Sequence, residues 1–268
     1  MARRDGGAGM GTGQPALVDS HVHLDRYTDE EIAGMVARAE AAGVGRLLTI
    51  GVDEASSRAA LHLAAEHPSI LAAVGIHPTR LLPLRAGDGG RAGGVDMLRD
   101  LLREARPAAI GEVGLDASAP DLTGQQHFLA ACLALAEERA LPLVLHVVGT
   151  TAVHEAALAL VSRRPRVRVV AHYFVSGPEL ARRYLEAGCW ISVGRPATRP
   201  TETAVREAVP LIPLDRLLLE TDTYPLPGRT TEPRDVVSVC LAVAELTGRS
   251  YAEVATATTS SFAAFIGQ

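Results

Sequence analysis

The stretch Val18-Asp19-Ser20-His21-Val22-His23 places two histidines two positions apart inside an apolar run typical of a buried strand. Side chains alternate along a strand, so His21 and His23 share one face and can point to the same place. Two imidazoles held in this way can bind one metal ion. An isolated His-x-His also arises by chance, so the rest of the chain must decide between a ligand pair and two structural histidines.

Short apolar runs and alanine-rich stretches of helical length alternate from Leu17 onward, in eight units. This alternation is typical of repeated βα units with parallel strands covered on both faces. A chain of 268 residues has the length of one such barrel. The sequence therefore predicts an α/β fold, a TIM (β/α)8 barrel, as a single domain over residues 16–268. We expect its strands at Leu17–Leu24, Arg46–Ile50, Ile70–Ile76, Ala108–Leu115, Leu143–Val148, Val167–Phe174, Cys189–Val193 and Arg216–Thr221.

Helix starts are indicated where a Ser or Thr precedes a Glu by three positions, as in Thr28 with Glu31 and Ser176 with Glu179. In this arrangement the two side chains satisfy backbone N–H groups that the first helical turn leaves unpaired. We expect the last two helices, around Pro233–Leu246 and Tyr251–Ile266, to complete the outer layer of the barrel.

Two glycine-rich segments stand outside these units. Residues 1–15 lack the apolar core of a secretory signal, so we expect a disordered leader on a cytoplasmic protein. Residues 82–94 predict a flexible loop after the third strand. On the C-terminal face of a barrel this loop is either a substrate lid or a tolerated surface insertion.

Composition excludes several mechanisms. The net charge is −5, so a phosphate-bearing substrate needs a local basic patch. The sequence contains no lysine, which excludes a Schiff-base mechanism and a carbamylated-lysine bridge between two metals. The three cysteines lie far apart and are expected to be buried and reduced. Charged residues, Gly or Pro interrupt every long apolar run, so we expect no membrane span, and no feature indicates an obligate protein partner.

Further polar residues end four of the other apolar runs, at Glu112, His146, His172 and Asp222. Each of them alone is compatible with a hydrogen-bonded core residue. Together with His21 and His23 they offer six ligands at the ends of five strands, which is where barrel enzymes place their active sites. Four imidazoles and two carboxylates can hold two divalent ions about 3.5–4 Å apart. Because no lysine exists to be carbamylated, Glu112 is the candidate bridging group.

In order and spacing these residues resemble the TatD-like metal-dependent hydrolases of the amidohydrolase superfamily, over residues 17–266. The motifs that carry the resemblance are Asp19-Ser20-His21-Val22-His23-Leu24-Asp25, Gly75-Ile76-His77-Pro78, Gly111-Glu112-Val113-Gly114-Leu115-Asp116, His146, Ala171-His172-Tyr173-Phe174 and Glu220-Thr221-Asp222.

The resemblance implies a TIM barrel with two divalent metal ions. One ion is expected on His21, His23, Glu112 and Asp222, and the second on Glu112, His146 and His172. Many family members are described as magnesium-dependent DNases, commonly exonucleases. Ligand softness favours Zn²⁺, Mn²⁺ or Fe²⁺ at nitrogen-rich sites, whereas the activity of the family is often supported by Mg²⁺. The expected cofactors are two divalent ions, Mg²⁺, Mn²⁺ or Zn²⁺.

Two departures from the family pattern concern the substrate pocket. After the fifth-strand histidine the family often has Ser or Cys and then Arg, whereas here Val147 and Val148 follow His146. The Arg that could hold a phosphate is therefore absent. After the sixth-strand histidine, Cys-Phe-Ser/Thr-Gly is usual, but this chain has Tyr173-Phe174-Val175-Ser176-Gly177. Both changes reshape the pocket wall and leave the ligands intact.

Several side chains on the predicted loops are candidates for substrate contacts. Arginines that can neutralise phosphates, or simply face solvent, are Arg80, Arg195, Arg199 and Arg229. Aromatic residues that can stack on a base, or merely pack, are Tyr173, Phe174 and Tyr224. His77 can hydrogen-bond to a substrate oxygen or orient a ligand. Our candidate substrate-binding residues are His77, Arg80, Arg195 and Tyr173.

The predicted mechanism is metal-assisted hydrolysis, in which a metal-activated hydroxide attacks a phosphoryl or carbonyl centre. Asp222 would accept a proton as general base, and Glu112 is the second catalytic carboxylate. The leading interpretation is a deoxyribonuclease acting on DNA. The alternative is a small-molecule ester, lactone or amide hydrolase, favoured by the negative net charge and by Val148. A non-catalytic scaffold is disfavoured, because it needs none of these costly buried polar residues.

Overall fold

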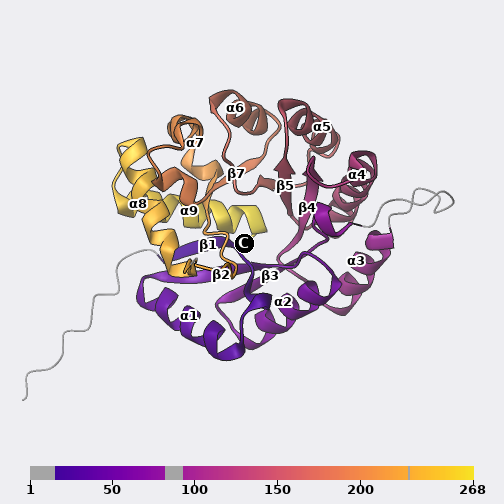
Figure 1. Cartoon of the computed structure of the whole chain (residues 1–268), viewed down its shortest axis with the longest axis horizontal. Coiled ribbons are helices and arrows are strands. Elements are labelled where there is room, and N and C mark those ends of the chain that lie inside the picture. Colours follow the sequence, from indigo (N-terminus) through magenta and orange to yellow (C-terminus); the bar gives the residue numbers. More distant parts are fainter. Residues whose placement is uncertain (1–15, 82–92, 229) are drawn as a thin grey trace, which may run out of the picture.

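The computed structural model describes residues 16–81, 93–228 and 230–268. Eight parallel strands follow one another around a ring in chain order, and helices surround them (Figure 1), which confirms the predicted TIM barrel. The strands are β1 (Leu17–Val22), β2 (Val44–Ile50), β3 (Ile70–Val74), β4 (Ala109–Asp116), β5 (Leu143–Val148), β6 (Val169–Ala171), β7 (Trp190–Val193) and β8 (Leu217–Leu219).

The ring closes between β1 and the chain that follows β8. Val22 and Thr223 form an isolated parallel bridge. The backbone N–H of His23 donates to the Thr223 carbonyl at 2.8 Å, and that of Asp222 donates to the His21 carbonyl at 3.0 Å. The closure therefore runs directly beside three candidate metal ligands.

Several strands are shorter than predicted. The predicted ranges Leu17–Leu24, Val167–Phe174 and Arg216–Thr221 all extend past the observed C-terminal ends. His23 and His172 are the first residues after their strands, and Asp222 follows β8 by three positions. These ligands leave the regular ladder because their backbones turn at the barrel mouth, which alternation of apolar residues does not reveal.

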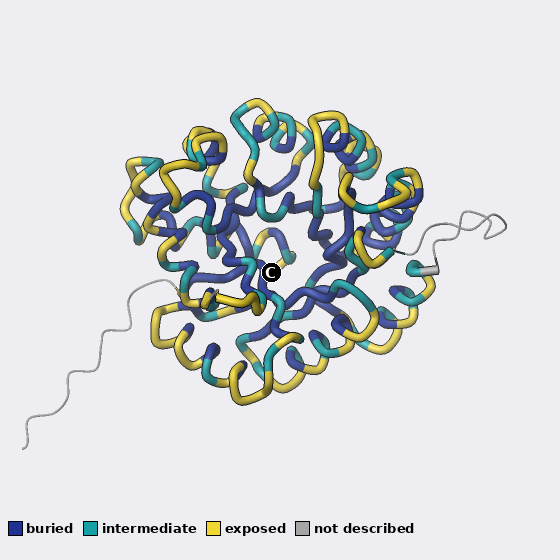
Figure 2. Tube along the Cα trace, in the orientation of Figure 1, coloured by how far each residue is buried: buried dark blue, intermediate teal, exposed yellow. Residues whose placement is uncertain are grey.

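Helices cover the outside of the barrel. Those among the described residues are α1 (Asp29–Ala41), α2 (Glu54–Glu66), α3 (Gly93–Glu104), α4 (Leu122–Arg139), α5 (Thr151–Val161), α6 (Pro178–Glu186), α7 (Thr203–Ala208), α8 (Val236–Thr247) and α9 (Tyr251–Ile266). Figure 2 shows the strands buried and the outward faces of the surrounding helices exposed. None of the described helices is both long and apolar enough to cross a bilayer.

One of the two predicted capping boxes is observed. Thr28 accepts a hydrogen bond from the Glu31 N–H, and the Glu31 carboxylate accepts one from the Thr28 N–H, so α1 begins as predicted. The prediction of a second capping box, at Ser176, is wrong. Helix α6 begins with Gly177 as its N-cap, without a side-chain cap, and has Pro178 in its first turn. Proline needs no N–H partner there, which lessens the need for a cap.

The final helix α9 does not complete the outer layer, contrary to the prediction. Its side chains Phe262 and Phe265 are buried with inward-facing strand residues such as Val18, Leu48 and Val144. Figure 1 shows the C-terminus near the centre of the ring, behind the strands. Helix α9 therefore closes the end of the barrel opposite the mouth.

Two predictions fall largely outside the described residues. The leader over residues 1–15 lies entirely outside them, as does most of the predicted glycine-rich loop over residues 82–94. Gly93 and Gly94 are described, and they begin α3 instead of belonging to a loop.

Candidate metal centre

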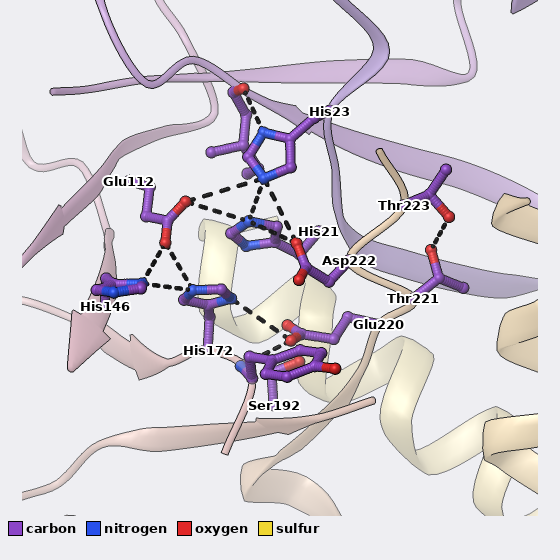
Figure 3. A network of polar contacts seen from close by, with 12 residues as sticks. His21, His23, Glu112, His146, His172, Ser192, Glu220, Thr221, Asp222 and Thr223 are labelled. Carbon is purple, nitrogen blue, oxygen red and sulfur yellow. Dashed lines mark hydrogen bonds and ion pairs between the residues drawn. The ribbon is translucent and has the colours of Figure 1, made fainter. Parts of the chain in front are cut away.

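All six predicted ligands meet at the C-terminal end of the barrel strands (Figure 3). Among the described residues, three groups of side chains bring potential ligand atoms within 4.8 Å of one another. These groups are His21 with Glu112 and His172, His21 with His23 and Asp222, and His77 with Glu112 and His146. Glu112 belongs to two of the three groups and lies between them.

The first half of the site lies between β1 and the segment after β8. The Nε2 atoms of His21 and His23 are 3.3 Å apart. His23 Nε2 lies 3.4 Å from Asp222 Oδ1, and His21 Nε2 lies 3.5 Å from Glu112 Oε2. Two imidazole nitrogens and two carboxylate oxygens therefore face one point, as the donors of a metal ion do.

The second half of the site is built around the other oxygen of Glu112. Glu112 Oε1 lies 2.6 Å from His146 Nδ1 and 2.7 Å from His172 Nε2. These two imidazole nitrogens are 3.2 Å apart. One carboxylate thus presents Oε2 to the β1 histidines and Oε1 to the histidines of β5 and the segment after β6. This is the arrangement required of a bridging ligand.

Charge and burial suit a cationic ligand. Burial alone would raise the pKa of Glu112, but charges on His172 and His146 hold it well below its ordinary value. Burial would also raise the pKa of Asp222, but the hydrogen bond from His23 and the charges of the neighbouring histidines together lower it. Both carboxylates are therefore ionised near neutrality. Ionised carboxylates and imidazoles at this depth need a compensating partner, which divalent ions supply.

Polar groups behind the ligands fix their orientation. The Ile50 carbonyl lies 3.2 Å from His23 Nδ1, and Asp116 Oδ2 lies 3.5 Å from His146 Nε2. Glu220 is fully buried, and its Oε1 lies 3.5 Å from His172 Nδ1. The Ile50 carbonyl is within hydrogen-bond distance, whereas the two carboxylates make only ion-pair contacts. Groups in these positions orient an imidazole and increase its basicity toward a metal.

The backbone at the site takes conformations that most residues avoid. Asp222 has φ of 50° and Tyr173 has φ of 46°. The Tyr173 N–H donates to Glu220 Oε1 at 2.6 Å, which helps to hold this turn. A left-handed conformation at a bulky residue costs about 1–3 kcal/mol and persists where the surroundings impose it.

At Gly114, an added Cβ would lie 1.8 Å from the His146 carbonyl oxygen, so only glycine allows β4 and β5 to approach this closely.

A pocket of about 370 Å³ opens at the candidate metal centre, and five of the six candidate ligands line it, all except the fully buried His21. Three of the four predicted substrate-binding residues, His77, Arg80 and Tyr173, line it. The fourth, Arg195, is not among the described residues that line this pocket, and its guanidinium donates to Thr231 Oγ1. Arg229 lies outside the described residues.

Sequence reasoning missed two charged residues of the pocket. Asp25 and Arg26 line it directly after β1, in the 3-10 turn Leu24–Arg26. The sequence feature that could have identified them is their position, two and three residues after His23. His77 also lies deeper than a pure substrate contact requires, because its Nε2 is 3.6 Å from Glu112 Oε1.

Comparisons with known proteins identify the family. A family model described as TatD related DNase matches residues 18–267. The chain is 33% identical over 259 residues to an uncharacterized metal-dependent hydrolase TatD from Mycobacterium tuberculosis, covering 91% of this chain and 95% of the relative. It is 33% identical over 207 residues to a protein named 3'-5' ssDNA/RNA exonuclease TatD from Klebsiella pneumoniae, covering 75% of this chain and 74% of that protein.

Among solved structures, the crystal structure of the TatD homologue YJJV from Escherichia coli superposes with a TM-score of 0.81 at 27% identity. The match covers 94% of this chain and 98% of that one.

Proposed function

Because the chain belongs to the TatD family of metal-dependent hydrolases, we propose that it is a deoxyribonuclease that hydrolyses phosphodiester bonds with two divalent metal ions. The observation that carries the proposal is the orientation of Glu112, whose two oxygens face separate sets of imidazoles. A site of this kind stabilises the charge that develops on a phosphoryl group during displacement.

The proposed roles follow from the positions of the side chains. His21, His23, Glu112 and Asp222 hold one ion, and Glu112, His146 and His172 hold the other. When bound, the ions supply Lewis acidity and lower the pKa of water. Asp222 is ionised and accepts the proton of the attacking water at Oδ1. His77 Nε2 faces the pocket beside Glu112 and donates to a substrate oxygen.

Two features support DNA as the substrate. Arg26 and Arg80 are exposed side chains that line the pocket and can pair with phosphates. A relative with 33% identity is named a 3'-5' ssDNA/RNA exonuclease.

The proposal also includes a cytoplasmic location and Mg²⁺, Mn²⁺ or Zn²⁺ as the metals. Elemental analysis of protein purified without chelator tests the metals directly.

The test is degradation of a single-stranded oligonucleotide with added Mg²⁺ or Mn²⁺. We expect cleavage by the wild type and a loss of at least about 100-fold in D222A, because the proton acceptor and one ligand are removed together. The matched control is D100A, which removes an exposed carboxylate on α3 and should keep full activity.

A specific observation favours the second candidate, a small-molecule ester, lactone or amide hydrolase. Val148 and Val175, both lining the pocket, are 46% and 45% exposed. An apolar rim suits an uncharged substrate better than a phosphate backbone. Turnover of esters or lactones, together with no oligonucleotide cleavage across a panel of divalent metals, would replace the DNase proposal with this one.

A further inference from the structure

A second cavity adjoins the metal-centre pocket. It has a volume of about 240 Å³ and shares lining residues with the first pocket, namely Val147, Val148, His172, Tyr173 and Val175. Its remaining lining comes from the helix side, including His154 on α5 and Tyr184 on α6. The cavity therefore lies between the wall formed by β5 and β6 and the helices α5 and α6, and it meets the metal centre at the loops that follow these strands.

The two cavities differ in charge. Arg26, Arg80, Asp25 and Asp222 line the first one, together with Glu112. Among the described residues, no Asp, Glu or Arg side chain lines the second. Most of its lining is apolar or aromatic. A ligand that spans both cavities would place its charged, reacting part at the metal centre and an uncharged part in the second cavity.

Two polar groups on the helix side of the second cavity pair with each other. His154 Nδ1 and Tyr184 Oη lie 2.8 Å apart, and both residues are buried. Burial lowers the pKa of His154, so its ring is neutral at physiological pH. Apart from His172, which the cavity shares with the metal centre, this lining is uncharged and favours an apolar ligand group over an ionic one.

We propose that this second cavity is a substrate subsite for an uncharged, ring-sized apolar group attached next to the bond that is hydrolysed. A cavity of about 150 Å³ is large enough for benzene, so the observed volume accommodates a ring with substituents. A nucleobase and an aromatic acyl or alkoxy group both present an uncharged ring with apolar faces. The subsite rests on the proposed hydrolytic function and defines which substituent the enzyme selects.

Equilibrium binding tests the subsite without requiring turnover. The probes are phenylphosphonate and methylphosphonate, measured by titration calorimetry on the Zn²⁺-loaded protein. Both share the anionic group that the metal centre would bind, and they differ only in the group offered to the second cavity. We expect phenylphosphonate to bind at least about tenfold more tightly, in line with burial of one ring. Equal affinities, or binding of neither probe, overturn the proposal.

A variant that fills the second cavity tests whether this cavity causes the preference for phenylphosphonate. Ser176 lines the second cavity and not the first, so S176F fills the subsite from its outer side. We expect the ratio of the two affinities to fall toward one in S176F and, to a smaller degree, in S176L. The control S162F places the same ring on an exposed position at the end of α5 and should keep the wild-type ratio. An unchanged ratio in both Ser176 variants overturns the assignment to this cavity.

Kinetic measurements show whether the ring in the subsite is a nucleobase or an ester substituent. They also test the subsite separately from the deoxyribonuclease proposal. If a nucleobase occupies the subsite, the wild type should cleave a normal dinucleotide faster than one that lacks the terminal base, and S176F should reduce this difference. If an ester substituent occupies it, aromatic esters should show the same dependence. A phenylphosphonate preference that persists in a protein without nuclease activity supports the subsite and removes the DNase proposal.

Discussion

The carboxylate of Asp19 joins β1 to the segment after β8 through Thr221. Asp19 is fully buried, and it accepts hydrogen bonds from the Thr221 backbone N–H at 2.9 Å and from the Thr221 hydroxyl at 2.6 Å. Both residues are close in sequence to a candidate metal ligand. His21 follows Asp19 by two positions, and Asp222 follows Thr221 directly. The pair therefore holds β1 beside the segment after β8, and these two pieces of chain carry ligands of the first half of the metal centre.

Replacing Asp19 by Ala should destabilise the protein and weaken metal binding. The change leaves the buried Thr221 N–H without its partner, which costs about 1–3 kcal/mol, and leaves the Thr221 hydroxyl with only its contact to Thr223 Oγ1. We expect a loss of at least about 2 kcal/mol in urea unfolding and weaker retention of metal on dialysis. The exposed Asp100 on α3 provides the control, because D100A should change neither quantity. Full metal retention in D19A would show that the pair does not position the ligands.

The bridging position of Glu112 predicts a difference in metal stoichiometry among ligand variants. E112Q removes negative charge from both halves of the site, so we expect it to lose both ions. H146A and H23A each affect one half, so each should retain about one ion of the two expected. Elemental analysis after dialysis measures the stoichiometry, with H127A, an exposed histidine on α4, as control. Retention of two ions by E112Q would contradict the bridge.

His77 should make the metal-free protein sensitive to mild acid. Burial lowers the pKa of His77 to about 4, below the ordinary value of 6.5. Between these values the unfolded chain binds a proton that the folded protein does not, so stability falls as pH decreases from about 6.5 to 4. The contribution reaches up to about 3 kcal/mol at the acid end.

Chemical unfolding of the chelator-treated protein at several pH values measures this effect. Relative to H77Q, the wild type should lose free energy of unfolding as the pH falls through this range. H127Q should follow the wild type, because His127 is exposed. Parallel pH profiles for the wild type and H77Q would count against burial of a neutral imidazole at this position.

The sequence was informative about the barrel and its ligands because both depend on local patterns. Apolar runs of strand length recur with helical stretches between them, and polar side chains at the ends of such runs stand out against their neighbours. Glu112 and His146 lie within β4 and β5, and His23 and His172 follow their strands directly. A strand end can therefore be found from sequence to within a few residues, which is sufficient to predict convergence.

The same pattern could not reveal how side chains and backbones are oriented. The left-handed conformations of Asp222 and Tyr173 depend on tertiary contacts, including the Glu220 bond to the Tyr173 N–H. Arg195 was placed at the mouth because it follows a strand, yet it pairs with Thr231. Asp19 lies in the same motif as His21 and His23, and the apolar pattern does not identify its partner, although a carboxylate inside an apolar strand requires one just as Glu112 does.

The prediction that α9 completes the outer layer of the barrel was wrong for a physical reason. A helix that packs on the outside of a barrel and one that closes its end both bury one apolar face, so their patterns are alike. Only the three-dimensional path distinguishes them. Here Phe262 and Phe265 enter the cluster of inward-facing strand residues, and the ring centroids of Phe265 and Trp190 are 5.9 Å apart.

This closure predicts that F265A destabilises the protein without affecting the metal centre. Phe265 is fully buried, and truncation of such a side chain to Ala costs about 3–5 kcal/mol through lost burial and the cavity left behind. Because α9 closes the end opposite the barrel mouth, the ligand geometry should persist, and metal stoichiometry should remain that of the wild type. L241A removes a side chain that is 53% exposed on α8 and should change stability by less than about 0.5 kcal/mol. A loss below about 1 kcal/mol in F265A, or a loss of metal at full stability, would contradict the role assigned to α9.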